Sequence, residues 1–236
     1  MDKPQVQYKQ KLAGEWIDWV EAENPDGSRE KEIYSLIKKW IDKVNPKQVV
    51  DIGCGQGICS TFIDSKINYV GVDLSEELIA RAGKLYQAPN RKFLVGNAYN
   101  IPLDDSSSEA AISIWVWSHL ADLEKAAKEM YRILKPGGKF LIITANPDTY
   151  EIRRTFYKSF KEYDGYLIGV FDLGEGKTLT NTTLYFHTKE KVMGVIRGSK
   201  LMIDRIEKIG LEEAYSGGLN ILIEGHKLPD TKTVIR

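Results

Sequence analysis

The sequence predicts an α/β fold, a doubly wound and mainly parallel sheet with helices on both faces. Over roughly the first 145 residues, short apolar runs alternate with segments whose apolar residues recur every three or four positions. One of these runs, residues 47–52, leads directly into three glycines at alternate positions. A strand that ends in a glycine-rich turn is typical of α/β domains that bind a ligand at the carboxyl edge of the sheet.

Each element of this first part is predicted from its own pattern. The strands are expected at residues 47–52, 68–73, 91–95, 109–116 and 138–145. The helices between them are expected at residues 57–65, 76–87 and 122–134. Ser75 and Asp122 lie just before the second and third of these helices, where side-chain oxygens cap free backbone N–H groups. A longer helix over residues 29–44 presents an apolar face to the sheet.

Residues 1–28 precede this core and contain Trp16, Ile17, Trp19 and Val20 among charged residues. This pattern predicts a short amphipathic cap helix. Two interpretations of its tryptophans stay open, because they either pack against the main domain or cover a substrate pocket.

Residues 146–190 break the alternation of strands and helices. A helix is predicted over residues 150–160, followed by two aromatic strand-like runs at 166–171 and 182–186 that suggest a hairpin. An insertion at this point emerges at the carboxyl ends of the strands, where ligands of α/β sheets lie. We therefore predict a substrate-covering segment, the alternative being a hairpin that only extends the fold.

The C-terminal part returns to the core over residues 191–228, and residues 229–236 are expected to form a loose tail. Helical periodicity runs from residue 189 to 209 with a break near Gly198. Two strands, at 211–216 and 219–226, are expected to pair in antiparallel fashion around the following glycine turn.

The glycine turn and the next strand carry the first functional signal. Because glycine has no Cβ, Gly53, Gly55 and Gly57 allow backbone N–H groups to approach a ligand closely. The run at 68–73 ends in Asp73, about 20 residues later, where Rossmann-type sheets place an acid that binds ribose hydroxyls. The dinucleotide pattern G-x-G-x-x-G has one residue more between its last two glycines than this chain has. The spacing therefore argues against NAD.

Four segments together resemble motifs of the class I S-adenosylmethionine-dependent methyltransferases: residues 49–57 (VVDIGCGQG), 70–75 (VGVDLS), 96–98 (GNA) and 133–142 (ILKPGGKFLI). The resemblance is firm over residues 29–145, which it implies to be the cofactor-binding core. It implies a Rossmann-like, doubly wound, seven-stranded sheet of order 3-2-1-4-5-7-6 with the last strand antiparallel, to which the insertion after the fifth strand adds the predicted lid. S-adenosylmethionine is the implied cofactor and S-adenosylhomocysteine its product.

The same resemblance implies roles for individual residues. Asp73 would hold the ribose, Leu74 would pack on the adenine, Asn97 would meet its amino group, and Asp51 would order the glycine turn. Arg29 is expected either to pair with the cofactor carboxylate or to be a solvated surface residue. The full set of expected cofactor-binding residues is Asp51, Gly53, Cys54, Gly55, Gly57, Asp73, Leu74, Asn97, Ala98, Trp115 and Arg29.

His119 follows the fourth strand, which points to the acceptor in this family, and is the candidate general base. Its ordinary pKa of about 6.5 makes neutral imidazole available near pH 7. The alternative is a histidine that packs or caps the following helix. The expected substrate-pocket residues are Trp16, Trp19, Trp117, Tyr166, Tyr185 and His187, of which the last could instead be an exposed hairpin residue.

Composition narrows the function further. The formal net charge is zero, so the broad attraction that nucleic-acid enzymes show is absent, and a small-molecule acceptor is expected rather than nucleic acid. Asp104 and Asp105 lie in a polar turn without further ligands nearby, so no metal site is expected. The chain has two cysteines, which are not expected to form a disulfide, and no apolar run of the roughly 18 residues that a membrane span needs.

The sequence accordingly predicts a cytoplasmic methyltransferase without a membrane partner, and no pattern in it predicts an oligomeric state. Three alternatives remain: a methyltransferase acting on protein or RNA, a non-catalytic S-adenosylmethionine-binding protein, and a nicotinamide-dependent oxidoreductase, which the glycine spacing disfavours.

Overall fold

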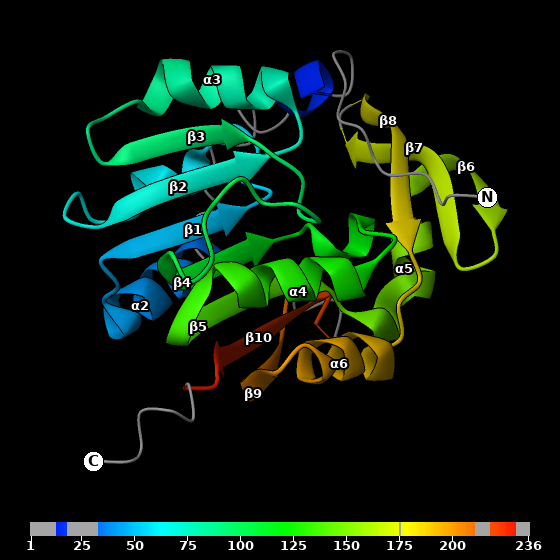
Figure 1. Ribbon diagram of the computed structural model, residues 1–236. Coiled ribbons are helices and arrows are strands. Elements are labelled where there is room, and N and C mark those ends of the chain that lie inside the picture. Colours follow the sequence, from blue (N-terminus) through cyan, green and yellow to red (C-terminus); the bar gives the residue numbers. More distant parts are fainter. Residues whose placement is uncertain (1–12, 18–32, 175, 211–217, 230–236) are drawn as a thin grey trace.

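The computed structural model describes residues 13–17, 33–174, 176–210 and 218–229. Within these residues the strands form one seven-stranded sheet and one separate three-stranded sheet (Figure 1). The strands of the larger sheet are β1 (Gln48–Ile52), β2 (Asn68–Asp73), β3 (Arg91–Val95), β4 (Ser108–Ile114), β5 (Leu134–Ala145), β9 (Leu201–Ile209) and β10 (Asn220–Lys227).

The order of the larger sheet is β3-β2-β1-β4-β5-β10-β9. Strands β1 to β5 pair in parallel, whereas β10 is antiparallel to both β5 and β9. Counted within this sheet alone, the order is 3-2-1-4-5-7-6, and the last strand of the chain is the antiparallel one. The predicted fold class is therefore confirmed.

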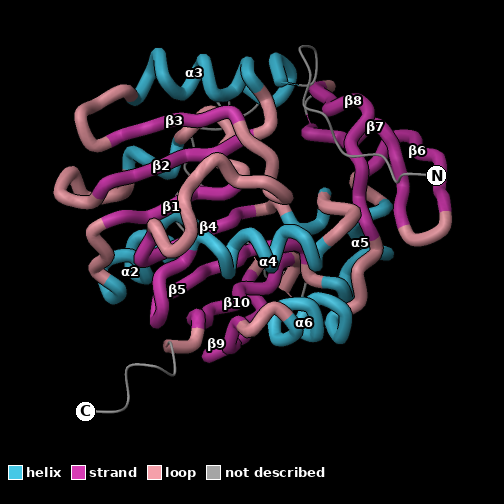
Figure 2. Tube along the Cα trace, viewed as in Figure 1, coloured by secondary structure: helices cyan, strands magenta, loops and turns pink. Residues whose placement is uncertain are grey.

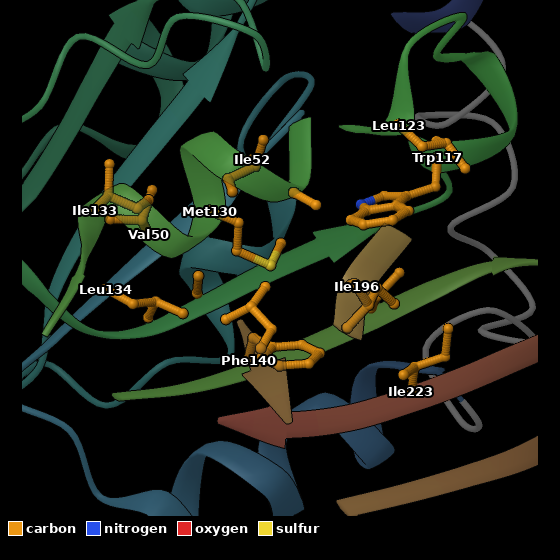
Figure 3. Close-up of a cluster of buried hydrophobic side chains, with 14 of the residues drawn as sticks. Val50, Ile52, Trp117, Leu123, Met130, Ile133, Leu134, Phe140, Ile196 and Ile223 are labelled. Atoms are coloured by element: carbon orange, nitrogen blue, oxygen red, sulfur yellow. The ribbon is translucent and has the colours of Figure 1, made fainter. Parts of the chain in front are cut away.

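The central strands are buried along most of their length because helices cover both faces of the sheet. In β1, Val49, Val50 and Ile52 are all buried although their side chains alternate between the two faces. Helix α2 (Ser35–Val44) packs on one face through Ile37 and Ile41. Helices α4 (Leu123–Ile133) and α6 (Lys189–Gly198) cover the other face. Figure 3 shows part of that second core, including Met130 of α4, Phe140 of β5 and Ile196 of α6.

The helix caps predicted from the sequence are formed. Helix α3 (Glu76–Tyr86) begins after Ser75, whose hydroxyl oxygen accepts a hydrogen bond from the backbone N–H of Leu78 at 3.3 Å. Helix α4 begins after Asp122, whose carboxylate accepts one from the backbone N–H of Lys125 at 3.0 Å. Each bond satisfies a backbone donor that the helix itself leaves unpaired, and it fixes the residue at which the helix starts.

The predicted helix over residues 57–65 is wrong. The structure has only one 3-10 turn there, Ile58–Thr61, which follows Gly57. Ile58, Thr61 and Ile63 are β-branched and lose side-chain freedom in a helix, so local propensity does not extend the turn.

The prediction for residues 189–209 is half right. Helix α6 ends at Gly198, Lys200 adopts a positive φ of 62°, and the chain continues as strand β9. The apolar residues of β9 fit both a helical and a strand period, and pairing with β10 decides for the strand. The strand predicted at 211–216 lies outside the described residues, and the partner of β10 is β9 instead.

The segment after β5 is a small sheet rather than a hairpin. Helix α5 (Tyr150–Arg154) is shorter than the predicted helix, because residues 157–163 pair as a strand with residues 166–171. Strands β6 (Tyr157–Tyr163), β7 (Tyr166–Gly174) and β8 (Lys177–Tyr185) form an antiparallel sheet of order β6-β7-β8. Figure 1 shows this second sheet on the side toward which the arrowheads of β1 to β4 point, and Figure 2 shows the same separation of the two sheets.

Candidate functional site

A cavity of about 400 Å³ lies between the carboxyl ends of the parallel strands and the second sheet. The main sheet contributes residues that end or follow β1 to β5, namely Gly53, Asp73, Leu74, Gly96, Asn97, Ala98, Ile114, Trp115, Val116 and Ala145. The second sheet contributes Tyr157, Phe171, Leu173, Leu179, Thr182 and Leu184. One space therefore joins the predicted cofactor-binding loops to the inner side of the insertion.

The glycine turn presents backbone to this cavity. Gly53 and Gly55 line the space and have positive φ angles of 80° and 56°, which glycine adopts without strain. A Cβ atom at Gly55 would meet only the indole nitrogen of Trp16, at 3.6 Å, so the turn offers an open cradle. Gly57 is different, because a Cβ there would lie 2.6 Å from Phe93, and it does not line the cavity. Gly57 therefore allows the turn to pack closely against Phe93.

Asp73 lies at the end of β2 with its carboxylate held by backbone donors. Its two oxygens accept hydrogen bonds from the N–H groups of Gly55 and Ser75, each at 2.9 Å. Burial raises the pKa of Asp73, and these N–H donors act in the opposite direction. Each carboxylate oxygen keeps a second lone pair, so the group can still accept hydrogen bonds from a pair of hydroxyls in the cavity.

The expected adenine-binding residues lie on the same side. Leu74 is 40% exposed and lines the cavity together with Asn97 and Ala98. The amide oxygen of Asn97 accepts a hydrogen bond from the backbone N–H of Tyr99 at 2.9 Å. This bond shapes the turn after β3 and fixes the orientation of the Asn97 amide.

A smaller cavity of about 70 Å³ lies behind the glycine turn and is lined by Asp51, Cys54, Gln56 and Trp115, among others. The amide oxygen of Gln56 is buried and has no hydrogen-bond partner among the described residues. Such an orphan acceptor suits a ligand that brings N–H donors, as the amino-acid arm of S-adenosylmethionine does. The open cradle at Gly55 and this acceptor both fit the cofactor that the sequence implies.

Asp51 is deeply buried beneath the turn. Its carboxylate accepts a hydrogen bond from the hydroxyl of Tyr69 at 2.6 Å. Burial raises the pKa of Asp51 to about 7, a trend that the Tyr69 and Cys59 hydrogen bonds oppose and the charge of Asp73 reinforces. Cys54 and Cys59 are both free, as expected, and burial raises their pKa values too.

His119 lines the cavity from the 3-10 turn Trp117–His119 that follows β4. Its Nδ1 lies 2.5 Å from the carbonyl oxygen of Thr183 in β8. A carbonyl only accepts, so Nδ1 carries the proton and the lone pair of the neutral ring resides on Nε2. Burial lowers the pKa of His119, which keeps the ring neutral at physiological pH. This tautomer suits a general base.

Trp115 has an unusual backbone. Its φ of 57° is left-handed, although it is not a glycine, and its indole N–H donates to the amide oxygen of Asn220 at 3.2 Å. Strain of this kind persists only where the surrounding structure holds it, and it concentrates at functional sites. Trp115 lines both cavities.

Several predicted pocket residues lie elsewhere. Trp117 is 2% exposed and packs in the hydrophobic core with Leu123, not in the cavity (Figure 3). Tyr166, Tyr185 and His187 do not line the cavity. The ring of Tyr185 stacks on His187, with centroids 5.7 Å apart, and is tilted against the ring of Tyr166 at 5.3 Å. Trp16 does line the cavity, whereas Trp19 and Arg29 lie outside the described residues.

His187 is buried rather than exposed. Its Nε2 lies 2.7 Å from the carbonyl oxygen of Leu120, next to His119. The two histidines therefore make reciprocal contacts. His119, after β4, bonds to a backbone carbonyl of β8, and His187, after β8, bonds to a backbone carbonyl of the segment after β4.

Sequence reasoning missed Arg153, which lines the cavity from α5. Its Nη2 donates to the side-chain oxygen of Asn220 at 2.8 Å and also to the carbonyl oxygen of Leu219. The available signal was a pair of arginines inside an otherwise aromatic insertion, yet only the fold shows which of the two turns inward.

In the described part of the chain, no group of three or more His, Cys, Asp or Glu side chains could hold a metal ion. No helix among the described residues is long and apolar enough to cross a membrane.

The sheet order, the glycine turn and the carboxylate at the end of β2 define a Rossmann-like domain that binds an adenosine-containing ligand. Residues 50–142 match a family described as methyltransferase domain. Over 176 residues the chain is 25% identical to a demethylmenaquinone methyltransferase of Symbiobacterium thermophilum, covering 68% of this chain and 70% of that protein. Over 104 residues it is 34% identical to a chloroplastic tocopherol O-methyltransferase of Arabidopsis thaliana, covering 42% of this chain and 30% of that one.

The crystal structure of the PH0226 protein from Pyrococcus horikoshii shares the fold, with a TM-score of 0.68 and 23% identity over 85% of this chain and 90% of that one. The family match and the methyltransferase relatives identify the chain as a class I S-adenosylmethionine-dependent methyltransferase, and hence as an enzyme.

Proposed function

We propose that this enzyme transfers a methyl group from S-adenosylmethionine to a small-molecule acceptor held in the 400 Å³ cavity. The observation that carries the proposal is the continuity of this cavity. It runs from Gly55 and Asp73, at the ends of β1 and β2, to His119 and the second sheet. Cofactor and acceptor can therefore meet in one continuous space.

The cofactor end is formed by residues of the main sheet. Gly55 provides the open backbone cradle, Gln56 the orphan acceptor, and Asp73 the carboxylate for the ribose hydroxyls. Leu74 provides the apolar surface for the adenine. When bound, S-adenosylmethionine supplies a methyl group on a positively charged sulfur, which is an activated leaving group.

The acceptor end is small and apolar. Tyr157, Phe171, Leu179 and Leu184 line it, and the sheet that carries them covers the space. A partly open, mainly apolar cavity suits a small molecule better than a protein side chain on a large surface or an RNA strand. The names of the two relatives above, which refer to menaquinone and tocopherol, support the same class of acceptor.

The protein contributes mainly position, exclusion of water and proton removal. Holding the acceptor against the methyl carbon supplies much of the rate enhancement. His119 would take the proton of a hydroxyl or amine acceptor as it reacts, a role that its neutral ring with the lone pair on Nε2 supports.

Calorimetric titration with S-adenosylhomocysteine and NAD tests the cofactor assignment. We expect binding of the first and none of the second. Asp73→Ala should weaken S-adenosylhomocysteine binding by about 1.5–3 kcal/mol, the range for hydrogen bonds to a charged group. Glu77→Ala is the matched control, because it removes an exposed acid in the first turn of α3 that does not line the cavity. NAD binding by the native protein, or equal affinity in the Asp73 variant, would contradict the assignment.

A further inference from the structure

Arg153 places a positive charge at the acceptor end of the cavity. It is the only Lys or Arg among the lining residues that the structure describes. Its neighbours there are aromatic and aliphatic, including Tyr157, Phe171 and Leu184. A guanidinium among apolar side chains has exchanged water for a poorly polar environment, and such a charge is unfavourable unless it is compensated.

The hydrogen bonds of Arg153 orient it without neutralising it. Nη2 donates to the amide oxygen of Asn220 and to the carbonyl oxygen of Leu219, both of which are uncharged. Asn220 is itself held by the indole N–H of Trp115 at 3.2 Å. The Nε–H of Arg153 is buried and has no partner among the described residues. The guanidinium is therefore fixed in place with donors to spare.

No carboxylate in the described part of the chain lies within ion-pair distance of Arg153. The neighbouring Arg154 contrasts with it, because its guanidinium pairs with Glu151 at 3.3 Å and with Glu162. Tyr150 and Tyr157 do not supply a counter-charge either, since burial raises the pKa of each hydroxyl to about 12. Burial lowers the pKa of Arg153 to about 10, so it stays protonated at neutral pH.

The carboxylate of the cofactor is expected at the other end. The orphan oxygen of Gln56 and the smaller cavity mark the site for the amino-acid arm of the cofactor, and Arg153 does not line that cavity. Arg153 instead lines the large cavity beside Tyr157 and Leu184, where the space left for the acceptor lies.

We propose that the methyl acceptor carries a carboxylate, attached to a flat or aliphatic apolar body, and that Arg153 binds this carboxylate. The inference rests on the proposed function and deepens it by naming the acceptor class. Guanidinium and carboxylate match in geometry, and their charge-assisted hydrogen bonds are strongest where water is excluded. Arg153 is then a specificity-determining residue of the acceptor site.

The test uses acids of increasing size, each paired with its neutral carboxamide: 4-hydroxybenzoate, 2-naphthoate and indole-3-acetate. Their binding to the full chain saturated with S-adenosylhomocysteine is measured by calorimetry. We expect at least one acid to bind at least tenfold more tightly than its amide. In Arg153→Gln that preference should disappear, while Arg153→Lys should keep part of it because the charge remains.

Arg154→Gln is the matched control, since it removes a neighbouring guanidinium that already has carboxylate partners, and it should keep the full preference. S-adenosylhomocysteine affinity is measured for every variant, which also shows that each variant is folded. The proposal is overturned if no acid is preferred tenfold over its amide, or if Arg153→Gln keeps the preference. It is also overturned if Arg153→Gln weakens S-adenosylhomocysteine binding tenfold or more, because Arg153 would then serve the cofactor. Failure of the native chain to bind S-adenosylhomocysteine would instead refute the proposed function.

Discussion

At the scale of single residues, His119 connects structure to chemistry most directly. Its Nδ1 is bound to the Thr183 carbonyl, and burial lowers its pKa below the ordinary value of about 6.5. The base form is thus complete at pH 7 and is lost only on acidification. We expect kcat/KM for an acceptor that must lose a proton to fall only below about pH 6.5.

Replacing His119 by Asn should lower kcat by a factor of about 10² to 10⁴, the usual contribution of a positioned base. S-adenosylhomocysteine affinity should stay unchanged. His226→Asn is the control, because this histidine lies 2.9 Å from Asp204 on the far strands of the sheet and does not line the cavity. An undiminished kcat in the His119 variant would exclude it as the base.

The burial of Asp51 predicts how the free energy of unfolding depends on pH. Its pKa rises from 3.8 to about 7 on folding, chiefly because it is buried. Between these values the unfolded chain has released the proton while the folded chain still holds it, so stability falls as pH rises from about 4 to 7. At 1.36 kcal/mol per pKa unit, the loss amounts to roughly 4 kcal/mol.

Urea unfolding of the native chain and of Asp51→Asn between pH 4 and 8 tests this. The amide does not ionise, so the variant should lack this part of the pH dependence. Asp42→Asn, at an exposed pair with Lys38, should keep the native profile. Parallel profiles for the native chain and the Asp51 variant would show that the carboxyl ionises equally in both states.

At the scale of elements, the second sheet is proposed to act as a lid over the acceptor. Phe171 of β7 lines the cavity and packs edge-on against Tyr157, with ring centroids 5.2 Å apart. Residues 13–17 brace the same sheet, because Trp16 packs on Leu179 and the Glu15 carboxylate accepts a hydrogen bond from the backbone N–H of Thr180 at 2.9 Å.

Phe171→Ala should raise the KM of an acceptor by about tenfold, since a lost aromatic contact of this size is worth roughly 1.4 kcal/mol or more. S-adenosylhomocysteine affinity should change by less than about threefold. Phe160→Ala removes an aromatic ring from the same sheet at a position that is 44% exposed and outside the cavity lining, and it should leave KM unchanged. Equal KM values in both variants would argue that the sheet is only an extension of the fold.

At the scale of the whole molecule, the features that the sequence predicts best are those determined by local patterns, such as strand ends and helix caps. The strand ends that carry Gly55 and Asp73 follow from apolar runs and a glycine turn, and the caps at Ser75 and Asp122 follow from one residue each. Strand β9 does not, because its apolar residues fit two periods and only its pairing with β10 selects one. Trp117 and Arg153 show the same limit, since which side chain faces a core and which a cavity is decided by elements distant in sequence.

The reciprocal histidine contacts have a mechanical consequence. His119 bonds to the carbonyl of Thr183 in β8, and His187, just after β8, bonds to the carbonyl of Leu120. Two hydrogen bonds therefore connect the second sheet to the turn after β4. Swinging the second sheet outward breaks both bonds at once. The imidazole of His119 then loses its hydrogen bond to the Thr183 carbonyl, which selects its tautomer, when the cavity opens to water. We therefore predict that closure of the second sheet over the cavity and orientation of the His119 base occur together.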